Sequence, residues 1–204
     1  PLDYTEQGTI HYIDALNLLV LGLNSAWEVD HHFKARAGIH SGAIAQALDR
    51  IRESETYRNS LKFAVWHHPL YSPFDGRITD QGFMERLAQA GFSVCFHGHI
   101  HKSNADLFRY DVPAGGGRIE MVGAGTFGAP IKDWFPGYPL QYNLLKIAGS
   151  KLIVQTRCRR EPGGAWKPDA IWTQDRGKDP VPRYTIDLSG AAIKPPKPPK
   201  PPFP

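Results

Sequence analysis

The chain has 204 residues, of which 41% are hydrophobic, so it can bury one sizeable core and does not require a second domain. Its formal net charge is +4, but lysines of the carboxyl-terminal tail contribute three of these charges, and the remaining +1 gives no electrostatic footprint for nucleic acid. Two cysteines exclude a disulfide framework, and no apolar run approaches the ~20 residues that a membrane-spanning helix needs.

The first predicted elements are two strands, over residues 9–14 and 16–23, which pair around a tight turn. The second run is apolar on both faces, as expected for a central strand. It ends in the polar residues Asn24 and Ser25, which therefore lie at the carboxyl end of a strand.

Two amphipathic helices are predicted further along the chain. The first runs from Ser41, which we expect to be its cap, to about Ser54. The second follows Thr79, its expected cap, and stops at Gly91. Apolar residues recur at helical spacing in both segments, namely Ile44, Ala47, Leu48 and Ile51 in the first and Phe83, Met84, Leu87 and Ala88 in the second.

Two short apolar runs, residues 61–66 and 92–96, are typical of buried strands. The motifs that follow them are His67-His68-Pro69 and Gly98-His99-Ile100-His101. The β-α-β-α-β order predicts a parallel sheet, in which the carboxyl ends of neighbouring strands meet at one edge. The sequence therefore predicts that the two histidine motifs converge where open α/β sheets bind ligands.

After His101 the pattern changes to antiparallel strands. They are expected over residues 105–111, 118–124, 140–147, 151–158 and 184–188, with a hairpin turn at 148–150 and mostly loop over 161–180. The Pro/Lys-rich segment 191–204 predicts a polyproline II tail. A linker is the favoured interpretation of this tail, and a ligand for an SH3-type partner is the alternative.

The order of the two histidine motifs resembles the second half of a calcineurin-like metallophosphoesterase. The resemblance covers roughly residues 10–130, and it places the carboxyl-terminal part of that domain in residues 1–190, before the tail of 191–204. It implies an α/β fold that is part of a four-layer β-sandwich flanked by helices. Such a fold would have a mixed sheet and an antiparallel carboxyl-terminal portion.

The resemblance also implies a dinuclear metal centre. Carried over by motif position, His67 and His99 would ligate one divalent ion and His101 the other, the ions being Mn, Fe or Zn in the complete domain. Neutral imidazole is a common ligand of such metals. Two ions ~3.5–4 Å apart can clamp a phosphoryl oxygen and generate hydroxide. The implied reaction is the hydrolysis of phosphate mono- or diesters by metal-bound hydroxide.

Three further residues are candidates for contacting the substrate or supporting the ligands. His68 should point away from the metal if the strand geometry persists, and we favour a hydrogen-bonding role for it over substrate contact. His97 lies in the strand itself, which favours a packed position beside the ligands. Asn24 lies at the cleft rim by its strand-end position, although turn chemistry explains this residue equally well.

The sequence departs from the family where carboxylate ligands are concerned. The family also uses Asp-x-His, Gly-Asp and Gly-Asn-His motifs, but this sequence contains neither a Gly-Asp nor an Asn-His dipeptide. Asp30-His31-His32 matches Asp-x-His by its letters, but it lies in a predicted loop. We therefore expect the chain alone to be inactive, with the missing amino-terminal half of the domain supplied in cis or by a second chain. No general acid can be assigned.

Two other functions remain open. One is a non-catalytic interaction module that presents the Pro-rich tail, and the other is a mononuclear zinc hydrolase built from the three histidines, as in His₃ sites. Because Pro1 is not a natural translation start, we expect the sequence to be a fragment. Cysteine usage favours a cytoplasmic protein, and we expect a phosphate-ester substrate but no membrane or nucleic-acid partner.

Overall fold

The computed structural model describes residues 3–33, 35–72, 76–100, 104–109, 118–128, 138–173, 179–189 and 191, and over 104–109 it describes the backbone alone. The helical elements are η1 (Tyr4–Glu6), η2 (Asp14–Leu16), α1 (Ser41–Glu53), α2 (Glu55–Arg58) and α3 (Gly82–Gln89). The strands are β1 (Gly8–Ile13), β2 (Leu18–Leu23), β3 (Leu61–Val65), β4 (Val94–His97), β5 (Asn104–Arg109), β6 (Arg118–Gly123), β7 (Leu140–Ala148), β8 (Lys151–Arg159), β9 (Lys167–Pro168) and β10 (Arg183–Asp187).

The first sheet is mixed and has the strand order β1-β2-β3-β4-β6-β5. Strands β2, β3, β4 and β6 are parallel, and the edge strands β1 and β5 pair antiparallel with β2 and β6. The predicted β-α-β-α-β core is confirmed. The predicted antiparallel pairing of 118–124 is confirmed on one side, where β6 pairs with β5, but on its other side β6 pairs parallel with β4 and so continues the parallel core. Ile119, Met121 and Val122 are buried on its two faces, as expected for a central parallel strand.

The second sheet is antiparallel, with the order β10-β8-β7. The short strand β9 pairs with the end of β8, beyond the part of β8 that pairs with β10. The hairpin between β7 and β8 turns at Gly149, whose φ of 57° favours glycine. Both strands and β10 lie close to their predicted positions. The short strand β9 falls within 161–180, which the sequence predicted as mostly loop.

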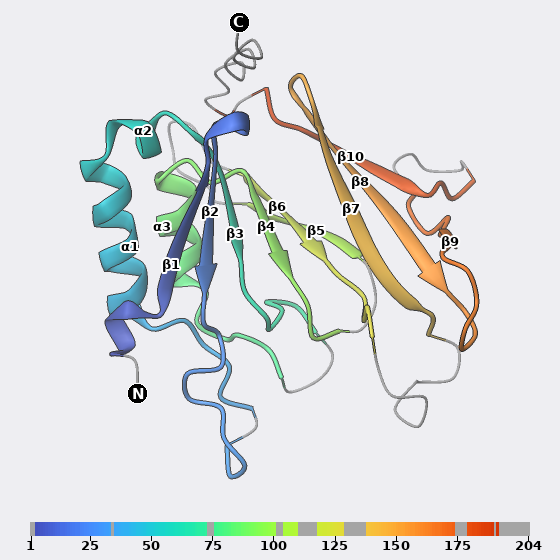
Figure 1. Cartoon of the computed structure of the whole chain (residues 1–204). Coiled ribbons are helices and arrows are strands. Elements are labelled where there is room, and N and C mark those ends of the chain that lie inside the picture. Colours follow the sequence, from blue (N-terminus) through green and yellow to red (C-terminus); the bar gives the residue numbers. More distant parts are fainter. Residues whose placement is uncertain are drawn as a thin grey trace, which may run out of the picture.

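The two faces of the first sheet bury two different sets of side chains (Figure 1). Helices α1 and α3 cover one face, where Leu19 and Ala64 pack against Ile44 and Met84. The second sheet covers the other face, and there Phe63 packs in a cluster with residues of β8 and β10. The described part of the chain is thus a mixed α/β structure of helices, mixed sheet and antiparallel sheet. The fourth layer stays a prediction.

The helices begin at slightly different residues from those predicted. His40 is the cap of α1, because its Nδ1 accepts a hydrogen bond from the backbone N–H of Ala43 at 3.3 Å, and Ser41 is already helical. Helix α3 begins at Gly82, so Thr79 lies too early to cap it. None of the helices in the described ranges is both long and apolar enough to span a membrane.

Candidate metal centre

Backbone pairing between β3 and β4 continues past the ends of both strands and brings the histidine motifs together. The N–H of Trp66 donates to the carbonyl of Phe96 at 3.1 Å, and the N–H of Gly98 donates to the carbonyl of His67 at 2.9 Å. These hydrogen bonds set His67 beside the segment that carries His99. The predicted convergence of the two motifs at the carboxyl edge of the sheet follows from this register.

The imidazole rings of His67 and His99 meet through nitrogen atoms. Nε2 of His67 lies 3.2 Å from Nδ1 of His99, and the two ring planes are nearly perpendicular, at 87°. Two nitrogen ligands at ~2.0–2.1 Å from a tetrahedral zinc ion are ~3.3 Å apart. The separation of these two nitrogens therefore fits a shared metal ion.

His99 has an unusual backbone conformation, and its ring lies close to Gly76. His99 has a φ of 67°, in the left-handed region that few residues other than glycine occupy. Its Nε2 lies against the backbone of Gly76, so closely that a β-carbon at position 76 would overlap it. Gly76 therefore leaves room for the ring in the orientation that turns Nδ1 toward His67.

His68 is buried beside these two rings and is held by Ser25. The Ser25 Oγ lies 2.9 Å from Nδ1 of His68, and it accepts hydrogen bonds from the backbone N–H groups of His67 and His68 at 3.1 and 3.0 Å. Since the oxygen uses both lone pairs as an acceptor, its hydroxyl proton is directed to Nδ1 of His68. We assign the neutral His68 proton to Nε2 from this hydrogen-bond pattern.

The environment of His68 keeps its ring neutral. Burial, reinforced by the neighbouring rings of His99 and His67, lowers the pKa of His68 to about 4, although Ser25 acts in the opposite direction. A neutral ring whose Nδ1 accepts from Ser25 can donate a hydrogen bond from Nε2. It would have to exchange its tautomer before Nε2 ligated a metal.

His67, His68 and His99 form a group whose nitrogen ligand atoms all lie within 4.8 Å of one another. In the described part of the chain, this group includes no carboxylate. Its donor set consists of imidazole nitrogens, which suit zinc, iron and related transition metals. The group could therefore bind a metal ion, with His67 and His99 as its best-placed ligands.

Two other predicted site residues take different positions. His101, the predicted ligand of a second ion, lies outside the described residues. His97 is buried, with its Nδ1 3.2 Å from the carbonyl oxygen of Gly98, and it is not part of the histidine group. Its backbone carbonyl accepts from Ala124 at 2.8 Å, which connects the ends of β4 and β6.

Asn24 shares a wider hollow with His67. This open hollow of about 1080 Å³ is also lined by the acidic residues Asp3 and Glu6. The Asn24 side chain donates to Gln7 at 2.6 Å and accepts from the N–H of Ala26 at 2.8 Å. Its amide thus supports the turn after β2, while Ser25, the next residue, contacts the histidines.

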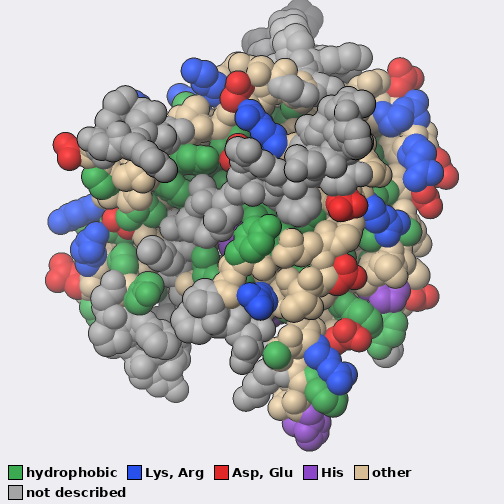
Figure 2. Space-filling view, turned by 180° about the vertical axis from the view of Figure 1, so that it is seen from behind, with side chains coloured by type: hydrophobic (Ala, Val, Ile, Leu, Met, Phe, Trp, Pro, Cys, Tyr) green, Lys and Arg blue, Asp and Glu red, His purple; other side chains and the backbone are tan. Residues whose placement is uncertain are grey.

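The Asp30-His31-His32 segment does not join the site. Figure 2 shows histidine side chains at the tip of the loop between β2 and α1, and all three residues are exposed there. The Asp30 carboxylate accepts from the N–H groups of His32 and Phe33, both at 2.8 Å. This carboxylate stabilises a local turn, as such side chains commonly do.

Comparisons with known proteins add little to this geometry. No protein-family model matches the sequence, and no curated protein matches it. Among solved structures, the chain is similar to a single-site mutant of Vps29 from Entamoeba histolytica, with 13% sequence identity and a TM-score of 0.28 over 82% of this chain and 98% of that chain. A likeness of this size carries no argument about function.

Proposed function

We propose that the chain supplies the histidine side of the metal centre of a calcineurin-like phosphoesterase that hydrolyses phosphate mono- or diesters. The observation that carries the proposal is the 3.2 Å separation between Nε2 of His67 and Nδ1 of His99 at the ends of neighbouring parallel strands. This arrangement supports the motif resemblance, because both motifs contribute to one group. A second divalent ion, held partly by His101, belongs to the same proposal.

Two of the histidines would hold the metal ion, and the third would contact the substrate. His67 and His99 would hold the ion, and a bound divalent metal would polarise a phosphoryl oxygen and acidify a water molecule. His68 would remain neutral and donate a hydrogen bond from Nε2 toward an oxygen of the substrate. Ser25 would hold the ring of His68 in the required tautomer.

A mononuclear zinc site is the second candidate. It is favoured by the absence of a carboxylate from the histidine group in the described ranges, since imidazoles alone can hold a single zinc ion. A two-metal centre needs carboxylate oxygens to bridge the ions and balance their charge. The described part of the chain offers none to this group, so the proposal takes them from elsewhere, in cis or from a second chain.

The first experiment measures metal binding by the chain itself. Zinc and manganese would be titrated calorimetrically into protein stripped with a chelator, and the metal content after reconstitution would be determined. We expect one zinc ion per chain, with binding weakened at least tenfold by His67→Ala or His99→Ala, because each change removes a ligand. His11→Ala is the matched control, since His11 is exposed on β1.

Zinc below stoichiometry after reconstitution would overturn the mononuclear hydrolase, because the chain alone supplies all the ligands of that site. If the metal binds, hydrolysis of bis-p-nitrophenyl phosphate would be assayed with the chain alone and with the chain joined to its native upstream segment. Activity that needs the upstream segment supports the two-metal phosphoesterase. Equal activity without that segment supports the mononuclear hydrolase.

A further inference from the structure

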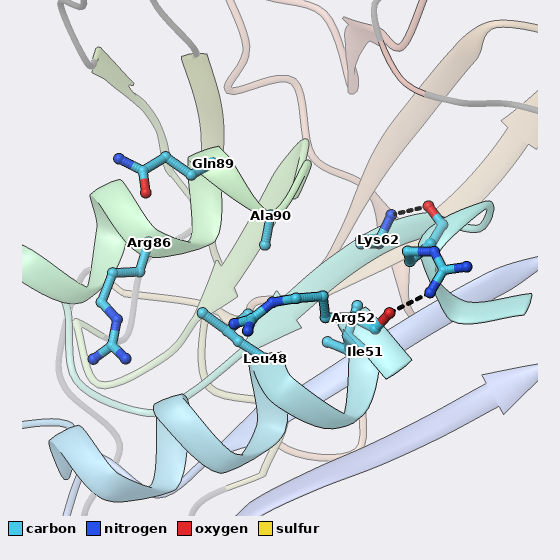
Figure 3. A pocket seen from close by; sticks show the side chains of 8 residues that line it. Leu48, Ile51, Arg52, Lys62, Arg86, Gln89 and Ala90 are labelled. Carbon is cyan, nitrogen blue, oxygen red and sulfur yellow. Dashed lines mark hydrogen bonds between the residues drawn. The ribbon is translucent and has the colours of Figure 1, made fainter. Parts of the chain in front are cut away.

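A second hollow, with a volume of about 480 Å³, lies at the opposite end of β3 from the histidines. It is bordered by the carboxyl-terminal parts of α1, α2 and α3 (Figure 3). Four basic residues line it, together with apolar side chains of α1, and no carboxylate is among the lining residues; the basic residues are Arg52, Arg58, Lys62 and Arg86. Arg52 is paired with Asp49 of the same helix at 2.8 Å, so the hollow combines the charges of the other three cations with an apolar surface.

Lys62 is the least exposed of these cations. The alternation of β3 places it on the face covered by the helices, where only 4% of its surface is exposed. Its Nζ donates to the carbonyl oxygens of Arg58 at 2.8 Å and Ser60 at 3.1 Å, which uses two of the three N–H groups of an ammonium. Burying an ammonium without a carboxylate partner is unfavourable, and an anion in the hollow would compensate this charge.

The arginines of the hollow differ in whether their guanidinium groups already form hydrogen bonds to the helices. The guanidinium of Arg58 donates to the carbonyl of Arg52, so it satisfies the carboxyl end of α1. The guanidinium of Arg86 makes neither a hydrogen bond nor an ion pair with another described residue, and Figure 3 shows it extending from α3 toward α1. Both arginines lie in the last turn of a helix, where a cation is favourable, but the Arg86 guanidinium extends away from its own helix and borders the same hollow as Lys62.

We propose that this hollow binds a small organic phosphate, independently of the histidine centre. Guanidinium groups present paired N–H donors that match phosphate oxygens, and Lys62 adds a further charge at the base of the same hollow. Leu48 and Ile51 would contact the nonpolar part of the ligand. The volume falls within the range of ~300–1,000 Å³ that is usual for small-molecule sites.

The test uses phenylphosphonate, a phosphate mimic that phosphoesterases do not hydrolyse, and inorganic phosphate as probes. Binding to the metal-free chain would be measured by calorimetry in the presence of a chelator. We expect saturable binding of phenylphosphonate at one site, tighter than that of inorganic phosphate because Leu48 and Ile51 contact the ring. Arg86→Gln should weaken it about tenfold, the size expected for a lost charge-assisted contact.

The controls separate this site from general charge effects and from the histidines. Arg50→Gln removes the same charge from an exposed position of α1 outside the hollow, and it should change the affinity less than about twofold. Lys62→Met should abolish saturable binding. If this buried substitution impairs folding, the exposed substitution Arg86→Gln still tests the proposal. No saturable binding, an equal effect of Arg50→Gln, or loss of binding in His67→Ala would overturn the proposal.

Discussion

The Ser25 hydroxyl oxygen lies 2.9 Å from Nδ1 of His68, although the two residues are 43 positions apart in sequence. The same oxygen accepts from the backbone N–H groups of His67 and His68. One small side chain at the end of β2 therefore fixes both the backbone and a ring at the end of β3. This contact makes Ser25 a positioning residue for the histidine group.

Ser25→Ala should destabilise the fold by ~2–3 kcal/mol, because the buried N–H of His68, the part-buried N–H of His67 and the His68 ring lose their shared partner. Urea denaturation of the chelator-treated chain would measure the loss. Ser41→Ala, at an exposed helix position, is the control and should stay within ~0.5 kcal/mol of the wild type. Equal effects of the two substitutions would contradict the role assigned to Ser25.

The stability of the chain should fall as the pH drops below the normal range of histidine. Burial first, then His99 and His67, lowers the pKa of His68 from 6.5 to about 4 in the folded state. Between pH 4 and 6.5 the unfolded chain binds more protons than the folded chain, so acid favours unfolding. This group lowers the free energy of unfolding by at most ~1.4 kcal/mol per pH unit. Denaturation of metal-free wild type and His68→Asn at several pH values should show the steeper loss in wild type. Parallel curves would contradict the assignment.

Gly76→Ala should weaken zinc binding about tenfold, since an added β-carbon would displace the His99 ring without removing a ligand. The matched control is Gly128→Ala, because a β-carbon at position 128 meets no atom within 4 Å. Calorimetric zinc titrations of both variants would provide the comparison. If both bind zinc as the wild type does, the close approach of Gly76 has no bearing on the site.

The buried carboxylate of Asp169, just after β9, should matter more for stability than an exposed ion pair. Asp169, which is 2% exposed, accepts from Gln141 at 2.6 Å and from Arg160 at 3.1 Å. Asp169→Ala should destabilise the chain by ~3 kcal/mol, because it leaves the buried Gln141 amide without this partner. Asp49→Ala breaks the exposed pair with Arg52 and should change the stability by less than ~1 kcal/mol. Urea denaturation would rank the two changes.

Much of the fold could be predicted from the periodicity of hydrophobic residues. The runs ending at Leu23 and Val65 are buried on both faces, and this pattern predicted central parallel strands. The direction of β6 could not be inferred, because a two-sided apolar strand fits either direction and its pairing with β4 depends on contacts distant in sequence. The cap of α1 was misassigned because serine is the commoner capping residue, whereas His40 supplies the acceptor here.

The candidate site was only partly predictable for a similar reason. Motif order predicted that His67 and His99 lie at neighbouring strand ends, and their short nitrogen separation agrees with that arrangement. The inclusion of His68 in the group depends on its hydrogen bond to Ser25, and the orientation of His99 depends on the absence of a side chain at Gly76. Neither relationship has a local sequence pattern. The strand-end position indicated Asn24 as a site residue, but the adjacent Ser25 is the residue that hydrogen-bonds to His68.

Because of the left-handed backbone at His99, selection for stability and selection for metal binding should favour different residues at this position. A non-glycine residue at a φ of 67° carries a conformational penalty that glycine avoids and asparagine reduces. In a randomised library, selection for heat resistance alone should therefore replace His99 with glycine or asparagine. Selection for metal retention should keep the histidine. The same position would thus record which pressure had acted on a population of variants.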